Sequence, residues 1–226
     1  MKKGAVIFAA AILSCVVAFA GMARAEGEQM VVDDSAYTVY ELTADPDFAI
    51  LEELLDEAVG VVIVPQLFKA GLIIGGEAGH GVILARDADT GDWSYPAFLD
   101  VGTASLGLQI GASETQVVFV IMTRDGLEAM LADNVEVGAE ASVAAGHVGA
   151  EVGAATTSTE LNDDIYAFGT SEGLFIGLSL EGTLLIPDQD ANMAYYGEAA
   201  TTREVIQAGE VSNEDADTLR LILKGE

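Results

Sequence analysis

Glycines interrupt this chain so often that they limit its fold more than any other feature. After Gly60 the sequence turns to short apolar, β-branched runs with glycines within and between them. The clearest runs cover residues 61–64, 72–74, 82–84, 117–122 and 174–180. A glycine inside a strand usually marks a bulge, a bend or the close approach of another backbone. We therefore expect a curved, mostly antiparallel, Gly-rich β-sheet.

Three helices are expected around this sheet. Asp45-Pro46-Asp47 predicts a helix start, because Pro is favoured in the first turn and acids there complement the helix dipole. A short helix is expected over residues 124–132, and a third over 212–224, where Ser212 and Asp215 would cap the start. No exact repeat or long linker divides the chain. A single α+β domain is the simplest interpretation.

The first 25 residues have the pattern of a secretory signal peptide. A basic start precedes an almost unbroken apolar stretch over residues 4–21, and Ala23-Arg24-Ala25 offers a small-x-small cleavage site. We expect cleavage near Ala25 and a periplasmic or secreted mature chain. A lipoprotein signal ending at Cys15 is the alternative, and it would anchor the protein. After residue 25 no apolar run approaches the roughly 18 to 20 residues of a membrane span.

Acidity is the second strong bias of the chain. It carries 37 Asp and Glu against 9 Lys and Arg, and loss of the leader would leave 6 basic residues and a formal charge of -31. Such an excess repels nucleic acid at long range, so nucleic acid is excluded as a partner. The acidity suits a saline habitat and an ordinary exported protein equally well. The only cysteine, Cys15, lies in the leader, which excludes an intramolecular disulfide.

Residues 26–44 are expected to form a loosely held acidic arm ahead of a domain over residues 45–226. Asp33-Asp34-Ser35 breaks the short apolar pieces of this arm, and residues 26–59 contain no Lys or Arg. The helix after residue 45 therefore has a purely acidic polar face. Membrane-surface helices normally carry basic residues there, so packing on a core is favoured.

Catalytic and metal sites find little support. His80 and His147 are the only histidines, and neither lies in a motif that would make it a base beside a nucleophile. Residues 188–192 alternate oxygen donors like a calcium loop, yet Met193 stands where that loop needs Gly. The acidic cluster over residues 87–92 is a second calcium candidate, which the turn of a hairpin explains equally well. We expect no enzyme activity, catalytic residue, metal or cofactor.

Six stretches follow one another along the chain: residues 64–71 leading into 75–84, then 93–98, 104–111, 138–146, 173–182, and Asn192 with 195–197. In this order they resemble the SYLF domain family, which includes exported bacterial proteins and the lipid- and actin-binding domains of some eukaryotic endocytic proteins. The resemblance spans roughly residues 45–200. It implies a non-enzymatic binding module whose best-described ligand class is phospholipid.

From the resemblance we expect an exported module of a bacterial cell envelope that binds phospholipid or a membrane surface. The alternative is an envelope protein with a structural or protein-interaction role and no small ligand, whose protein partners are unknown. Because the chain looks exported and bacterial, actin is not expected as a partner.

Lys69 stands out within the resemblance, because it is the only lysine between the leader and Lys224 and precedes the glycine run. It would hold a lipid headgroup as a point charge, or pair with one of the many acids. The aromatic candidates would line a lipid pocket or fill the core. The candidate ligand-binding residues are Lys69, Gly71, Gly75, Gly76, Gly79, Gly81, Trp93, Gln109, Tyr195 and Tyr196.

Overall fold

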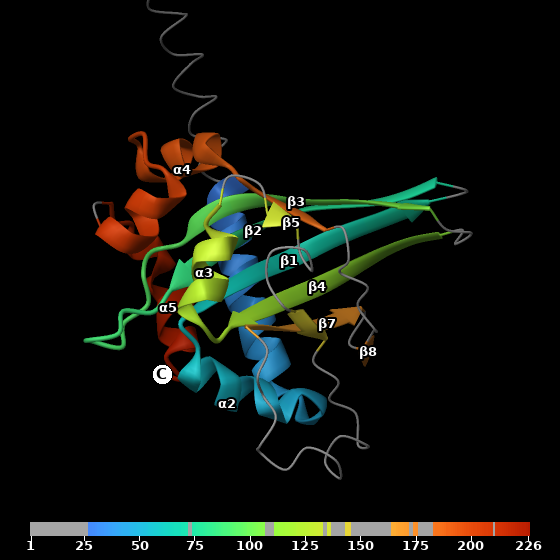
Figure 1. Ribbon diagram of the computed structural model, residues 1–226, viewed down its shortest axis with the longest axis horizontal. Coiled ribbons are helices and arrows are strands. Elements are labelled where there is room, and N and C mark those ends of the chain that lie inside the picture. The colour runs from blue at the N-terminus through green and yellow to red at the C-terminus, as the bar shows by residue number, and fades with distance from the viewer. Residues whose placement is uncertain are drawn as a thin grey trace, which may run out of the picture.

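Four long antiparallel strands form the centre of the sheet in the computed structural model (Figure 1). They are β1 (Gly60–Gly71), β2 (Ile74–Ala85), β3 (Ala97–Leu106) and β4 (Gly111–Ile121). The structure describes residues 27–71, 74–106, 111–132, 135–136, 143–145, 164–171, 174–175, 183–209 and 211–226.

Five shorter strands extend the sheet on both sides. The strand order is β5-β9-β3-β2-β1-β4-β7-β6, with β8 paired to β7, and the β6–β7 pair alone is parallel among these strands. Their bounds are β5 Val135–Glu136, β6 Val143–Ala145, β7 Ile165–Ser171, β8 Leu174–Phe175 and β9 Leu184–Pro187. The α+β fold with a mostly antiparallel sheet is confirmed.

Helical segments precede, interrupt and follow the strands. A helix covers residues 27–44, and the others are η1 Pro46–Phe48, α2 Ala49–Glu57, α3 Arg124–Met130, α4 Gln189–Tyr196, η3 Glu204–Ala208, η4 Glu214–Ala216 and α5 Asp217–Leu223. The three expected helices are present, whereas α4 and the 27–44 helix were not expected. None of the helices in the described part of the chain has both the length and the hydropathy of a membrane span.

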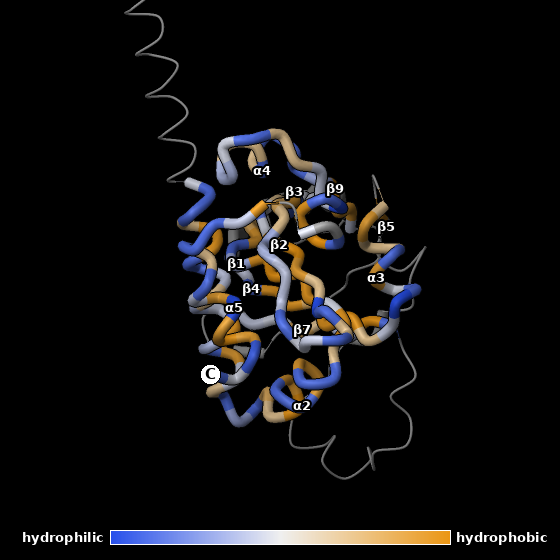
Figure 2. Tube along the Cα trace, turned by 90° about the vertical axis from the view of Figure 1, so that its left-hand side faces the viewer, coloured by the Kyte–Doolittle hydropathy of each residue, from blue (hydrophilic) through white to orange (hydrophobic). Residues whose placement is uncertain are grey.

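The sheet separates two apolar cores. One core joins Val61, Val82 and Val118 to the 27–44 helix, α2, α4 and α5, and the other joins the opposite side of the strands to α3, β5 and η3. Figure 2 shows α5 and α3 on opposite sides of the strands, with hydrophobic residues between them. Residues 61–64, 82–85 and 117–121 are buried on both sides of the sheet, which is why these parts of the strands are continuous apolar runs.

The prediction of a loosely held arm over residues 26–44 is wrong for the described residues 27–44. Val32, Val39 and Leu42 are at most 1% exposed and belong to the first core. One face of the helix is therefore buried, while Asp33 is exposed and Asp34 and Glu41 are partly exposed. The Nε2 of Gln29 donates to the carbonyl of Asp215, which ties this helix to the C-terminal segment.

Side-chain caps set where several helices begin. Asp45 accepts a hydrogen bond from the backbone N–H of Asp47, as its place before Pro46 predicts. Asn213 caps η4, the segment that leads into α5, by accepting from the N–H of Asp215, so the assignment of Ser212 to this role is wrong. The helical path begins one residue later than the sequence pattern indicated.

A bulge in β1 explains two of the glycines in β2. The register between the two strands shifts between Ile63 and Gln66, which moves their backbone carbonyls toward β2. A Cβ on Gly81 would lie 2.5 Å from the carbonyl oxygen of Ile63, and one on Gly79 would clash with the carbonyl oxygen of Gln66. The expected close approach of another backbone is therefore present at these two glycines.

Candidate functional site

Eight residues form an exposed area of the sheet, which we call the open sheet face. They lie in two neighbouring cross-strand rows: Phe68, Ala78, Gly102 and Leu184 in one, and Gln66, His80, Asp100 and Ile186 in the other. Alternate residues of a strand share a face, and the next partners along these strands are the core residues Ile63, Val82 and Phe98. The open sheet face therefore continues the side of the sheet that carries the 27–44 helix. Figure 1 shows the long strands reaching well past that helix.

Three large apolar side chains lie at the two edges of the open sheet face. Phe68 is 53% exposed, and Leu184 and Ile186 are 40% and 39% exposed. Between Phe68 and Leu184 lie only small residues, and a Cβ on Gly102 would meet no atom within 4 Å. The row of Phe68, Ala78, Gly102 and Leu184 therefore has one large apolar side chain at each end and nearly bare backbone between them. The second core packs against the other side of the sheet. Such an area suits contact with another surface more than enclosure of a small molecule.

His80 and Asp100 form the polar part of the open sheet face. Nδ1 of His80 donates to Oδ1 of Asp100 over 2.7 Å, and their side chains are 73% and 47% exposed. This pair fixes the ring of His80 across the β2–β3 register. A catalytic dyad would also need a nucleophile within hydrogen-bond reach, and within the described part of the chain the hydrogen-bond partner of His80 is Asp100. The pair is therefore an exposed hydrogen bond that orients the ring of His80 on the surface.

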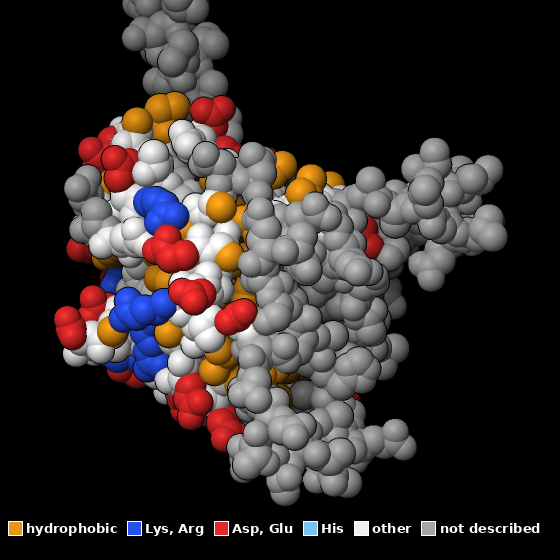
Figure 3. Space-filling view, viewed as in Figure 1, with side chains coloured by type: hydrophobic (Ala, Val, Ile, Leu, Met, Phe, Trp, Pro, Cys, Tyr) orange, Lys and Arg blue, Asp and Glu red, His pale blue; other side chains and the backbone are white. Residues whose placement is uncertain are grey.

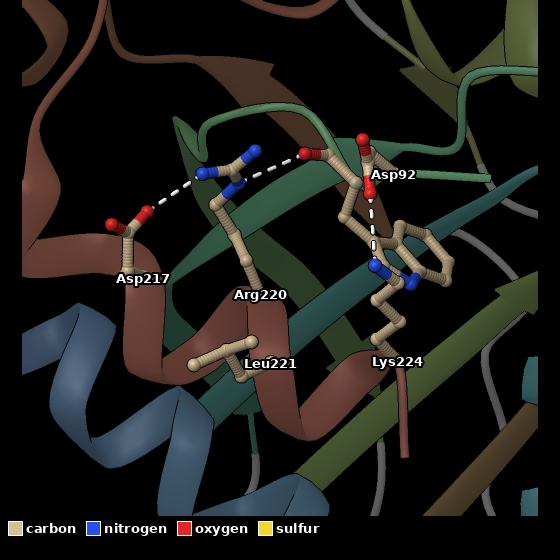
Figure 4. Close-up of a pocket in the computed structure, with 6 residues that line it drawn as sticks. Asp92, Asp217, Arg220, Leu221 and Lys224 are labelled. Carbon is tan, nitrogen blue, oxygen red and sulfur yellow. Dashed lines mark hydrogen bonds and ion pairs between the residues drawn. The ribbon is translucent and has the colours of Figure 1, made fainter. Parts of the chain in front are cut away.

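A hollow lies where α5 meets the turn before β3. It has a volume of about 260 Å³ and is lined by Asp92, Trp93, Asp217, Arg220, Leu221 and Lys224. Figure 4 shows Arg220 and Lys224 reaching toward the turn from α5. Figure 3 shows the Lys and Arg side chains gathered on the left of that view, with Asp and Glu side chains beside them.

Both cations of this hollow are already paired. Arg220 contacts Asp217 at 2.6 Å and donates through Nε to the carbonyl of Trp93, while its guanidinium lies 4.2 Å from the centre of the Tyr95 ring. Lys224 contacts Asp92 at 3.1 Å, and this pairing raises the pKa of the lysine. These contacts hold the C-terminal helix against the turn. Because both positive charges already have acidic partners, the hollow is a poor site for an anion.

The predicted glycine-strand candidates come together on neighbouring strands. Lys69 and Gly71 lie on β1, and Gly75, Gly76, Gly79 and Gly81 on β2, where Lys69 is the register partner of Glu77. The glycines at 79 and 81 admit the bulged backbone of β1. Gln109 and His147 lie outside the described residues. The role of Lys69 in holding a headgroup stays a prediction.

The aromatic candidates lie in or against the first core, which also contains Val61 of β1 and Val82 of β2. Trp93 is 2% exposed, and its indole N–H donates to the carbonyl of Leu223 over 3.0 Å. Tyr195 packs edge-on against Phe98 and Tyr196, with ring centres 5.1 and 5.0 Å away. The hydroxyl of Tyr195 donates to Gln29, and that of Tyr196 donates to the carbonyl of Pro96. These contacts account for the three residues through packing and hydrogen bonding.

Stability is expected to fall as the pH rises above about 10, the ordinary tyrosine pKa. Burial, followed by nearby acidic charges for Tyr195 and by Tyr195 for Tyr196, raises both phenol pKa values. Above about pH 10 the unfolded chain loses phenol protons that the folded chain keeps. Each of the two phenols therefore lowers the free energy of unfolding by about 1.4 kcal/mol per pH unit. Urea denaturation at a series of pH values will show this slope, and Tyr196→Phe will reduce it. An unchanged slope in the variant contradicts the assignment.

Both calcium candidates have structural explanations. Asp188 is the residue before α4 and accepts a hydrogen bond from the N–H of Ala191, so it caps the helix. Asp87 accepts from the backbone of Asp89 and Thr90, and these bonds lower its pKa. Within the described ranges, no three His, Cys, Asp or Glu side chains gather as a metal site would require.

Sequence reasoning missed the open sheet face and the 27–44 helix. The open face depends on the bulge in β1, because this bulge decides which side of the sheet Gln66 and Phe68 occupy. Pro65 lies within this bulge and is a sequence signal for it, because a proline in a central strand is largely confined to bulges. The helix also had a signal, since Val32, Val39 and Leu42 recur at helical spacing. The acidic residues between them obscured that pattern.

Comparison with known proteins identifies relatives over most of the chain. The model of the Ysc84 family, described as Las17-binding protein actin regulator, matches residues 102–225. LAS seventeen-binding protein 3 of Saccharomyces cerevisiae is 33% identical over 162 residues, which cover 71% of this chain and 35% of the relative. Protein YSC84 of the same yeast is 32% identical over 173 residues, covering 76% of this chain and 36% of the relative.

Further relatives carry an SH3 domain in their names. An SH3 domain-containing protein of Schizosaccharomyces pombe is 31% identical over 176 residues, covering 76% of this chain and 40% of the relative. The chain thus spans roughly a third to two fifths of the length of these relatives. The family description, Las17-binding protein actin regulator, and the name LAS seventeen-binding protein 3 contradict the expectation that actin has no place among the partners. That expectation rested on predicted export and not on the residues of the domain.

Proposed function

The chain belongs to the Ysc84 family, the SYLF domain family of the sequence resemblance, and from this membership we propose that it is a non-enzymatic binding module whose partner is a protein of the actin-regulatory class. One relative is named for binding LAS seventeen and another for its SH3 domain, and none of the names given above is that of an enzyme.

The open sheet face is the observation that carries this proposal. Its apolar side chains Phe68, Leu184 and Ile186 are exposed on a rigid sheet, and the pair of His80 and Asp100 lies beside them. Apolar anchors with polar groups around them are the composition of a protein interface. Truncation of such anchors usually removes most of the binding energy of an interface.

Binding to filamentous actin and to purified Las17 tests the proposal. We expect the chain from residue 26 onward to co-sediment with the first or to capture the second. Phe68→Ser combined with Leu184→Ser should weaken that binding about tenfold or more. Leu221→Ser is the matched control, because Leu221 is 47% exposed on α5, outside the open sheet face. Folded protein that binds neither probe contradicts the proposal.

Phospholipid binding by an exported chain is the second candidate. Phe68 and Leu184 are apolar side chains on one exposed row, and such residues can insert into a bilayer interface. The leader pattern of residues 1–25 supports delivery to the periplasm or beyond, where envelope lipids are the available surface.

Flotation with neutral and anionic liposomes, at low and high salt, separates the two candidates. Lipid binding predicts flotation that Lys69→Glu reduces if that lysine holds the headgroup. Absence of flotation under every condition removes this candidate and leaves the protein partner. The mass of the mature chain recovered from an exporting host tests cleavage near Ala25, and an intact leader contradicts export by this route.

A further inference from the structure

The outer side of the 27–44 helix carries a line of exposed residues, which we call the tyrosine stripe. It consists of Met30, Asp33, Tyr37, Tyr40 and Ala44, all exposed and spaced alternately three and four residues apart. This spacing places them along one line of a helix, over a length of about 21 Å. The buried residues Val32, Val39 and Leu42 lie on the opposite side, so the position of the stripe is fixed by the core.

The tyrosine stripe exposes more apolar area than single surface residues do. Met30, Tyr37 and Tyr40 are 62%, 59% and 62% exposed. Isolated exposed apolar residues are common, but a line of them at three and four residue spacing is the pattern by which a helix receives another extended or helical segment. Aromatic residues and Met are also the side chains enriched at protein interfaces.

Acidic residues lie within the tyrosine stripe and along one side of it. Asp33 lies within it, Asp34 and Glu41 lie along one flank, and no Lys or Arg occurs anywhere from residue 26 to 59. Partial burial, and to a smaller extent the charge of the neighbouring Asp33, raises the pKa of Asp34. A cation placed here would relieve this repulsion, and it would meet two exposed phenol rings that attract cations through their faces.

From this geometry and charge we propose that the tyrosine stripe docks a basic segment of another protein, with Arg or Lys side chains over Tyr37 and Tyr40. A second copy of the chain would bring the same acids against each other, and an anionic membrane would be repelled. The inference rests on the proposed protein-binding function and adds a second surface, with the charge of its partner, to the open sheet face.

Fluorescence anisotropy with a labelled synthetic peptide that places Arg and Leu at helical spacing tests the proposal. The chain from residue 26 should bind it. Tyr37→Ser combined with Tyr40→Ser, which leaves the net charge unchanged, should weaken binding about tenfold. Tyr37→Phe combined with Tyr40→Phe should retain it, because the ring faces remain. Met193→Ser combined with Leu221→Ser is the control, since both residues are exposed on other helices.

Equal binding by all variants would mean that the peptide follows net charge alone, and this result would overturn the proposal. Hydrogen exchange of the 27–44 helix gives a second measurement, because a docked peptide should slow exchange there and leave α5 unchanged. The Phe68→Ser, Leu184→Ser variant distinguishes the two surfaces. It should bind the basic peptide normally even if it has lost the actin-class partner, so either proposal can fail without the other.

Discussion

Gly81→Val is expected to destabilise the protein by about 3 kcal/mol, the upper part of the usual range for overpacking. The first atom of the new side chain would lie 2.5 Å from the carbonyl oxygen of Ile63 and 3.1 Å from Cγ2 of Val64. The oxygen belongs to backbone held in the β1–β2 pairing, so it cannot rotate away as a side chain would. For a domain of this size the melting temperature should fall by about 6 to 12 °C. Thermal denaturation followed by the fluorescence of Trp93 measures it.

Gly102→Ala is the matched control for this prediction. Gly102 lies on the adjacent strand β3, and an added Cβ would meet nothing within 4 Å. Alanine there should leave stability unchanged or raise it slightly, because glycine costs backbone entropy in the unfolded state. Equal losses at both positions would mean that glycine is needed for general strand flexibility and that the bulge of β1 is not the cause.

Leu42→Ala is expected to cost about 2 to 5 kcal/mol, the usual range for a leucine truncated in a packed core. Leu42 is 1% exposed and belongs to the core between the sheet and the 27–44 helix. A loosely held arm would predict a change within about 0.5 kcal/mol, as for other surface substitutions. Urea denaturation of the chain from residue 26 onward distinguishes these two values.

Met30→Ala on the same helix provides the control for Leu42→Ala. Met30 is 62% exposed, so its truncation removes little buried area and should leave the urea midpoint nearly unchanged. If both variants behave alike, the helix does not contribute its buried face to the core, and the packing of residues 27–44 described above is wrong.

The sequence was informative where one local rule decides the structure. Asp45 before Pro46 marked a helix start, and the acidic run over residues 87–92 marked a turn, because capping and turn formation depend on neighbours in the chain. The helix over residues 27–44 was missed because its buried side includes the polar residues Ser35 and Thr38, and Asp33-Asp34 interrupts its apolar pattern. Helices of this kind are stabilised mainly by tertiary packing.

The candidate site depended on register, which the sequence does not encode locally. Phe68 and Leu184 are more than 100 residues apart in the chain, and they share a row only because β1, β2, β3 and β9 align in one register. A shift of one residue in β1 would turn Phe68 to the other side. The glycine run was correctly associated with close backbone approach, yet the spacing of the glycines does not reveal that Gly79 and Gly81 face the bulge of β1.

The contact between the first and last helices also sets an order for folding. Strands β1, β2 and β3 follow one another in the chain and can pair as hairpins soon after they are synthesised, and β4 then pairs with β1. The 27–44 helix, by contrast, completes its packing only with Tyr195 and the segment around Asp215. A nascent chain that has not yet released α5 leaves Trp93 uncovered and the helix without part of its partner surface. Closure of the molecule is therefore a late event in its biogenesis, and it joins the two ends of the sequence.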